Sequence, residues 1–174
     1  DASAILALAA AEAETISANA SFEEGSQRAA EGWDLWVKWG VGSMYRSDEV
    51  AADGQWSCCC DGMQRGGPNQ MVQIDPGPHA ATCQVYVPEG QSVSGTVTLG
   101  LTVLDSEGKN AETYSTELRI RPGEWTEGTL VADIPEQVGG QRPSRARLIV
   151  IVDGFEPDEK VYIDELKAYR LPGH

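Results

Sequence analysis

The sequence WDLWVKWG holds the most informative candidates for ligand binding, because its tryptophans alternate with polar and apolar residues. In an extended strand, successive side chains point to opposite faces. This alternation places Asp34, Trp36 and Lys38 on one face, and on the other it places Trp33, Leu35, Val37 and Trp39. A large aromatic ring with polar neighbours on an outer face suits stacking against a sugar ring. Trp36 is therefore a candidate carbohydrate-binding residue, and the alternative is that a loop covers it.

A second group of candidates lies in the polar segment CDGMQRGGPNQ, residues 60–70. Arg65, Asn69 and Gln70 carry hydrogen-bonding groups that suit sugar hydroxyls, and the Gly-Gly-Pro sequence among them is typical of a turn. We expect these side chains to contact a glycan together with Trp36 and, where it is exposed, Trp39. The alternative is an ordinary surface turn without a ligand.

The segment KVYIDELKAYRL, residues 160–171, contains an acid at a break in its apolar pattern. Val161 and Ile163 fit one face of a strand, whereas Leu166 and Ala168 fall on the other face. A strand that buries both halves must absorb one extra residue as a β-bulge. The pattern therefore predicts a bulge at Asp164 and raises the question of why a carboxylate stands there.

The charge of the chain excludes several classes of partner. Asp and Glu number 27 against 13 Lys and Arg, for a formal net charge of −14. A field of this sign repels phosphate backbones and anionic lipids, so we expect no nucleic acid and no membrane partner. Neutral ligands and divalent cations are not disfavoured. No apolar run approaches the length needed to cross a bilayer.

Catalytic signatures are missing from the sequence. The two histidines are His79, in a turn-like PGPH segment, and His174, at the end of the chain. No nucleophile elbow, phosphate-binding loop or metalloprotease helix occurs. A glycosidase needs only a pair of carboxylates, but nothing in the sequence singles out such a pair. We therefore expect a non-catalytic chain.

The four cysteines do not have zinc-binding spacing. Cys58, Cys59 and Cys60 are consecutive, and Cys83 is distant. In a strand, Cys59 faces away from its two neighbours, so at most one of the three residues can pair with Cys83. Buried free thiols and one disulfide both fit this pattern.

The elements that must position these residues are strands. TVTLGLTVL alternates between apolar and polar or small residues, DSEGKN then supplies a turn, and about ten such runs follow one another. The pattern predicts an all-β fold, a two-sheet antiparallel β-sandwich or jelly roll, in one domain. We assign residues 19–174 to it. Residues 1–18 are rich in alanine and are expected to be a linker, a short helix or the tail of an upstream domain.

Three motifs together resemble a known family. NASFEEG (residues 19–25), Gly-Trp at 32–33 and VYIDEL (residues 161–166) occur in the order found in carbohydrate-binding modules of the cellulose- and xylan-binding type. These modules belong to the galactose-binding-like β-sandwich group. The resemblance covers nearly all of the chain after residue 18. It implies that a first strand around Ser21 to Glu24 lies beside the last strand.

The resemblance also implies a structural calcium ion. In such modules the Glu of the Phe-Glu pair and the Asp of the last strand hold the ion with backbone carbonyls, and here these residues are Glu23 and Asp164. Calcium accepts several oxygen ligands in irregular geometry, which suits a carboxylate at a bulge. The alternative is that Asp164 caps the bulge or pairs with Lys160 or Lys167.

The function implied by the resemblance is that of a non-catalytic carbohydrate-binding module. Its partners would be a polysaccharide or oligosaccharide, weakly bound and neutral or lightly charged, and the catalytic domain of the same polypeptide. The parent protein would be a secreted or cell-surface glycoside hydrolase or polysaccharide lyase. Two alternatives belong to other classes of function. One is a structural sandwich domain that packs against a catalytic domain or subunit, and the other is a jelly-roll lyase that uses His79.

Overall fold

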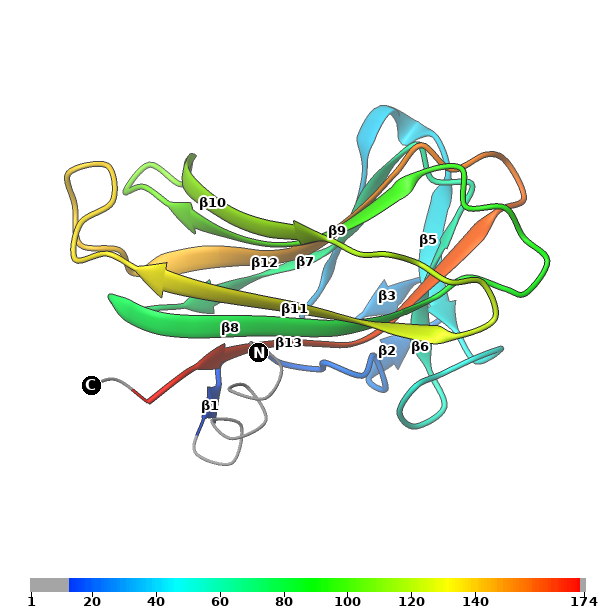
Figure 1. Ribbon diagram of the computed structural model, residues 1–174, viewed down its shortest axis with the longest axis horizontal. Coiled ribbons are helices and arrows are strands. Elements are labelled where there is room, and N and C mark those ends of the chain that lie inside the picture. The colour runs from blue at the N-terminus through cyan, green and yellow to red at the C-terminus, as the bar shows by residue number, and fades with distance from the viewer. Residues whose placement is uncertain (1–12, 173–174) are drawn as a thin grey trace.

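The computed structural model describes residues 13–172 as two antiparallel β-sheets packed face to face (Figure 1). The back sheet consists, in spatial order, of β11 (Trp125–Ile134), β8 (Gly77–Tyr86), β13 (Lys160–Arg170), β6 (Ser57–Asp61) and β5 (Ser43–Ser47), with β1 (Glu14–Thr15) paired to β13. The front sheet consists of β10 (Asn110–Glu117), β9 (Thr96–Leu104), β12 (Arg145–Asp153), β7 (Arg65–Gln73) and β4 (Asp34–Val37). This arrangement confirms the predicted all-β antiparallel sandwich.

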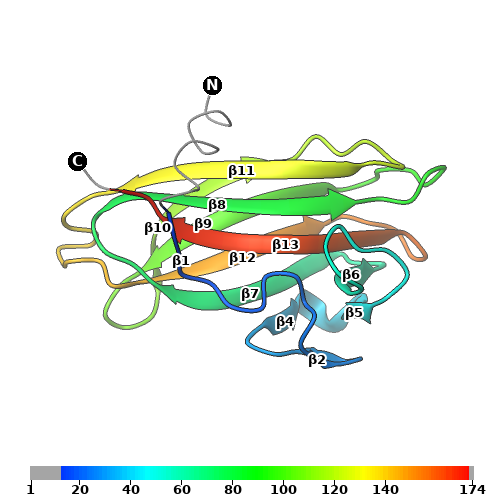
Figure 2. The same ribbon diagram turned by 90° about the horizontal axis from the view of Figure 1, so that it is seen from below.

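Smaller elements complete the fold. β2 (Gly25–Ser26) and β3 (Ala29–Ala30) form a separate hairpin, and the short 3₁₀ helix η1 (Lys38–Gly40) follows β4. Figure 2 shows the long strands β11, β8 and β13 side by side across the back sheet. Among residues 13–172, no helix is long and apolar enough to cross a membrane.

The core lies between the two sheets and follows from the alternation of the strands. In β9, Val97, Leu99, Leu101 and Val103 all have 0% exposure. The partner strand β12 buries its own alternate residues Ala146, Leu148, Val150 and Val152 against the same core. Each strand therefore presents one apolar face to the interior and leaves its other face free to carry a site.

The predicted bulge in the last strand is confirmed. The register between β13 and β8 shifts between Asp164 and Lys167, and Glu165 has a φ of 46°. This extra residue lets Ile163, before the bulge, and Leu166, after it, both reach 0% exposure.

Residues 65–70 form part of strand β7 and not the turn that Gly-Gly-Pro predicted. A Cβ atom on Gly66 would lie 2.3 Å from the carbonyl oxygen of Trp36, and one on Gly67 would lie 1.5 Å from that of Val150. Glycine is therefore required because β7 approaches both neighbouring strands closely. Pro68 has no N–H to donate, and the β7–β12 pairing is interrupted beside it. Composition alone could not distinguish this close approach from a turn.

The N-terminal part of the domain differs from expectation in two ways. Ser21 to Glu24 is a loop and not the first strand, although it lies beside the last strand, where Leu166 N donates to Ala20 O at 3.0 Å. Phe22 has a φ of 57°, which a strand does not allow. The contacts of the sandwich begin at β1, before the boundary expected at residue 19. The expected helix or linker in residues 1–12 lies outside the described residues.

All four cysteines are free and buried. Cys58 and Cys60 belong to the core between the sheets, and Cys59 points to the other side of the back sheet. Burial raises the pKa of the Cys59 and Cys83 thiols to about 12, so neither forms a nucleophilic thiolate at neutral pH.

Candidate functional site

A groove with a volume of about 410 Å³ lies on the outer face of the front sheet. Its polar lining comes from all five strands of that sheet: Asp34, Arg65, Asn69, Thr102, Asn110 and Arg147. Its apolar lining consists of Trp36, Ile149 and Ile151. The groove therefore combines one aromatic ring, two aliphatic side chains and several hydrogen-bonding groups.

Strand register sets the order of these residues along the groove. Asp34 lies opposite Asn69, and Asn69 lies opposite Ile149 on the other side of β7. One step further along, Trp36 lies opposite Gly67. Because paired strands hold their side chains in rows across a sheet, the groove is lined by successive rows of side chains, with the ring of Trp36 near one end.

Trp36 occupies the outer face, as its alternation with Leu35 and Val37 predicts. It is half-buried, so part of its surface is accessible from the groove. Beside it, the amide of Asn69 donates to the backbone oxygen of Asp34 at 3.3 Å and lies 3.4 Å from its carboxylate. Arg65 forms an ion pair with Asp153. These contacts fix the groove side chains before any ligand arrives.

The fold thus brings together three of the predicted binding residues: Trp36, Arg65 and Asn69. Gln70 lies elsewhere, because β7 turns its side chain inward. Its amide accepts from Ala18 N at 2.9 Å and donates to Ala18 O at 3.0 Å, and its exposure is 9%. Gln70 therefore anchors the N-terminal segment to the front sheet.

Trp39 lies outside the groove lining. The chain leaves the strand at Lys38, and Trp39 has a φ of 62° in η1, so the alternation that placed it on the core side ends at Val37. Its exposure is 69%, and Lys38 Nζ lies 4.7 Å from its ring centroid. Trp39 is thus a free aromatic surface next to the end of β4.

Six groove residues were not predicted from the sequence: Asp34, Thr102, Asn110, Arg147, Ile149 and Ile151. Asp34 shares the outer face with Trp36, so the same alternation identifies it. The alternation of RARLIVIVD likewise places Arg147, Ile149 and Ile151 on one face. Thr102 and Asn110 depend on the pairing between strands, for which the sequence contains no signal.

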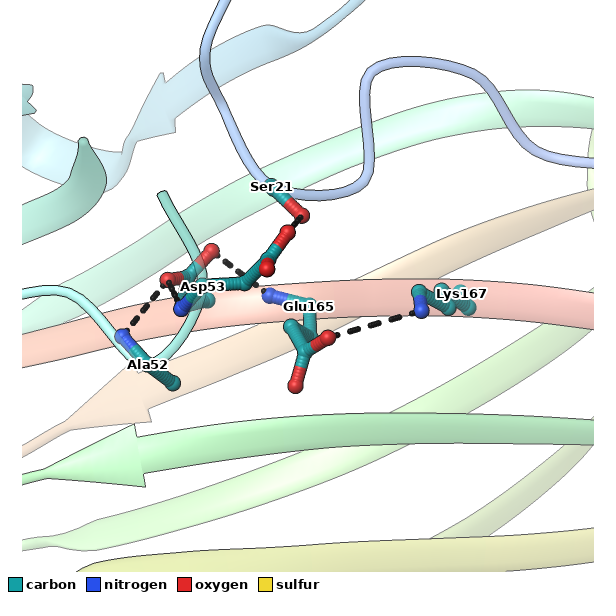
Figure 3. A network of polar contacts seen from close by, with 6 residues as sticks. Ser21, Ala52, Asp53, Glu165 and Lys167 are labelled. Carbon is teal, nitrogen blue, oxygen red and sulfur yellow. Dashed lines mark hydrogen bonds and ion pairs between the residues drawn. The ribbon is translucent and has the colours of Figure 1, made fainter. Parts of the chain in front are cut away.

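A second polar region, here called the clasp, consists of Glu23, Arg46, Asp164 and the loop at residues 50–56. Asp164 has 0% exposure. Its Oδ2 accepts from Ala52 N at 2.8 Å and Asp53 N at 3.0 Å, and its Oδ1 accepts from Glu165 N at 2.8 Å (Figure 3). Asp164 therefore caps the bulge and holds the loop, and Lys167 pairs with Glu165 instead.

Glu23 holds the other end of the same loop. Its two carboxylate oxygens accept from Gln55 N and Trp56 N, each at 2.8 Å. Figure 3 also shows Ser21 and Asp53 pointing toward each other, with the Ser21 hydroxyl donating to Asp53 Oδ2 at 2.8 Å. The N-terminal loop, the 50–56 loop and β13 are thus joined by polar contacts.

Arg46 supplies the positive charge of the clasp. Its guanidinium donates to the backbone oxygens of Phe22 at 2.7 Å, Glu23 at 2.7 Å and Ser26 at 3.2 Å. It also stacks 4.2 Å from the ring centroid of Trp56, and its exposure is 4%. A buried arginine that satisfies three carbonyls ties β5 firmly to the N-terminal loop.

The donors in the clasp do not fit a calcium ion. Every carboxylate oxygen of Glu23 and Asp164 accepts from a backbone N–H, and Arg46 already donates to three backbone oxygens of residues 22–26. Among the described residues, no three His, Cys, Asp or Glu side chains form a group that could hold a metal. Calcium binding by Glu23 and Asp164 stays a prediction from the resemblance alone.

Burial raises the pKa of Asp164 to about 7, although its three backbone N–H donors act in the opposite direction. Burial also lowers the pKa of His79, which has 1% exposure in the interior. His79 therefore lies away from the groove and does not offer an accessible imidazole to a ligand.

Comparison with solved structures identifies the fold. No family model and no curated protein matches the sequence. A structure named Family 16 Carbohydrate Binding Module-2 is 17% identical, with 88% of this chain and 98% of that chain covered and a TM-score of 0.63. The CBM22-1 xylan-binding domain from Paenibacillus barcinonensis Xyn10C is 16% identical, with 88% and 92% covered and a TM-score of 0.60.

A third similar structure is named as an enzyme and not as a carbohydrate-binding module. A cyclase from Fischerella sp. TAU is 13% identical, with 93% of this chain and 99% of that chain covered and a TM-score of 0.70. At such identities, likeness shows the fold alone. The chain shares its β-sandwich fold with these two carbohydrate-binding modules and with the cyclase.

Proposed function

We propose that this domain binds a glycan chain in the groove of the front sheet. The observation that carries the proposal is the half-buried ring of Trp36, set beside the hydrogen-bonding side chains of Asp34 and Asn69. A sugar presents C–H groups on its faces and hydroxyls at its edge, so it uses both kinds of surface at once. The fold shared with a xylan-binding domain supports the same function.

The lining of the groove favours binding over catalysis. Hydrolysis of a glycosidic bond usually needs two carboxyl groups on either side of the bond. Among residues 13–172, Asp34 is the one acid that lines the groove, and Asp153 beyond its end is paired with Arg65. A lyase that used His79 would need this histidine at the surface, whereas it is buried. We therefore propose a non-catalytic module, although the fold also occurs in a cyclase.

The domain would act by proximity. A module of this kind, linked to the catalytic domain of a secreted glycoside hydrolase or polysaccharide lyase, raises the local concentration of polysaccharide at the enzyme. A packing domain would instead need a continuous apolar surface. The large apolar side chains that are exposed lie on separate elements, in the turn at Trp39 and Val41, on β7 at Met71, before β9 at Val93 and on β11 at Val131.

Affinity electrophoresis in gels containing neutral or acidic polysaccharides tests the proposal. Wild-type protein should be retarded by at least one glycan. Trp36→Ala should lose most of this retardation, because a stacking aromatic contributes on the order of 1–3 kcal/mol by analogy with stacking on planar bases. A melting curve of the variant separates lost binding from lost folding.

Trp39→Ala is the matched control, since it removes a more exposed tryptophan from outside the groove lining. Retardation that survives in Trp39→Ala and disappears in Trp36→Ala would assign binding to the groove. The reverse result would assign it to η1. If no glycan retards the wild-type protein, the packing-domain alternative is favoured.

A further inference from the structure

The groove differs in charge from the rest of the chain. The whole sequence has a net charge of −14, and acids outnumber bases by about two to one. The charged residues that line the groove are instead two arginines, Arg65 and Arg147, and one acid, Asp34. Once Asp153, the ion-pair partner of Arg65, is counted, two arginines face two aspartates, so the groove is close to neutral within a strongly acidic molecule.

The two arginines are not equivalent. Arg65 is neutralised by Asp153, which lies directly opposite it in the register between β7 and β12. Arg147 has Met71 and Thr102 as its neighbours on the adjoining strands, and neither residue is charged. Within the part of the chain that the structure describes, Arg147 forms no ion pair and no side-chain hydrogen bond.

Arg147 is half-buried, and unlike the buried Arg46 it has neither a carboxylate nor a carbonyl partner for its guanidinium among the described residues. Its guanidinium presents a planar set of N–H donors that matches the two oxygens of a carboxylate. Since the protein itself does not supply the carboxylate, a ligand can. A densely charged polyanion would be repelled by the overall field, so the fitting ligand is one that carries isolated carboxylates.

The spacing along the groove indicates how long this ligand must be. Trp36 lies opposite Gly67, and the register of β7 with β12 places Gly67 opposite Ile151. Arg147 is four residues from Ile151 on the same strand, or about 13 Å at roughly 3.3 Å per residue. A ligand that reaches both groups must therefore be longer than one sugar ring.

We propose that Arg147 binds the carboxylate of a uronic acid residue in a glycan whose neighbouring sugars lie over Trp36. This inference rests on the proposed function, because it assigns a substrate class to the same groove. It narrows the expected ligand, a neutral or lightly charged glycan, to a sparsely acidic chain.

The experiment compares each acidic oligosaccharide with its own carboxyl-reduced form, which is neutral and otherwise identical. The main probes are oligosaccharides of glucuronoxylan, in which uronic acids are isolated, and oligosaccharides of homogalacturonan and alginate, in which every residue is acidic, serve as the densely charged comparison. Each is titrated calorimetrically into the wild-type domain, Arg147→Gln and Arg145→Gln. Arg145 is the matched control, because it lies on the same face of β12 but outside the groove lining.

For at least one backbone, the wild-type domain should bind the acidic form about tenfold or more tightly than the reduced form, since hydrogen bonds to charged groups are among the stronger ones. Arg147→Gln should bind both forms equally and with the wild-type affinity for the reduced form. Arg145→Gln should keep the preference. Added salt should weaken the preference in wild type.

Equal binding of both forms of every backbone by the wild-type domain would overturn the proposal, because glycan binding would be intact without acidic specificity. Loss of the preference to the same extent in both arginine variants would also overturn it, because this would indicate a general charge effect. Tighter binding of a sulfated oligosaccharide on the same backbone would contradict the carboxylate. Failure to bind any probe would overturn the proposed function as well.

Discussion

The groove and the clasp both gather charged and polar side chains, but they use them in opposite ways. In the clasp, Arg46 donates to three backbone oxygens and Asp164 accepts from three backbone N–H groups, and both are almost fully buried. In the groove, Trp36 and Arg147 keep accessible surface, and Arg147 has no charged partner among the described residues.

This difference separates structural from ligand-binding polar groups. A polar group whose partners are all internal contributes to folding, because its desolvation is already compensated. A group that the fold positions but leaves unpaired has its hydrogen bonds available to a ligand. The two regions should therefore respond differently to the same substitutions.

The largest expected effect compares the two arginines. Arg46→Ala leaves one buried and two part-buried carbonyls without their donor and removes the stack on Trp56, so it should lower the free energy of unfolding by about 3–5 kcal/mol. Arg147→Gln should change it by no more than about 0.5 kcal/mol. Urea denaturation measures both values. Similar losses in the two variants would erase the distinction between clasp and groove.

The next effect concerns the pH dependence of the clasp. Because burial raises the pKa of Asp164 to about 7 from an ordinary value of 3.8, the folded state binds the proton more tightly than the unfolded state. The stabilising contribution is present at low pH and is lost as pH rises from about 4 to 7. His79 acts in the opposite sense, because burial lowers its pKa and disfavours its protonation in the folded state.

Asp164→Asn isolates the first contribution, since His79 is common to both proteins. The difference in unfolding free energy between wild type and variant should be largest near pH 4 and should shrink toward pH 7, by up to about 1.4 kcal/mol per pH unit. Denaturation at a series of pH values measures it. A difference that grows with pH would show that the three N–H donors outweigh burial at this carboxylate.

The sequence predicted more of the fold than of the site, and the residues show why. The alternation in β9 and the phase break at Asp164 are local patterns. The first is sufficient to predict a strand, and the second is sufficient to predict a bulge in the last strand. Gly66 and Gly67 predicted a turn where the structure has a strand, because their role depends on neighbouring strands that are distant in the sequence. Trp36 was placed correctly by its immediate neighbours, whereas Gln70 was turned inward by the same strand that carries Asn69 outward.

Arg46 was missed for a related reason. Nothing in the sequence around it shows that three carbonyls from residues 22–26 converge on its side chain. The resemblance carried by NASFEEG and the two later motifs implies a cation at Glu23. The fold supplies that positive charge from β5, a strand that the alternation did not predict.

The smallest expected effect is therefore that of calcium. An ion that binds only the folded protein raises the melting temperature by mass action, with the logarithm of its concentration once this exceeds the Kd. Since N–H groups already face the oxygens of Glu23 and Asp164, and Arg46 holds the nearby carbonyls, millimolar calcium and a chelator should leave the melting temperature unchanged. Differential scanning fluorimetry of wild type, Asp164→Ala and Arg46→Ala checks this.

A rise in melting temperature with calcium in wild type that is absent in Asp164→Ala would instead establish the calcium site implied by the family resemblance. It would mean that the ion displaces the 50–56 loop from the two carboxylates. A calcium response that appears only in Arg46→Ala would be the sharpest support for the clasp, because it would show that the arginine occupies the position of a cation.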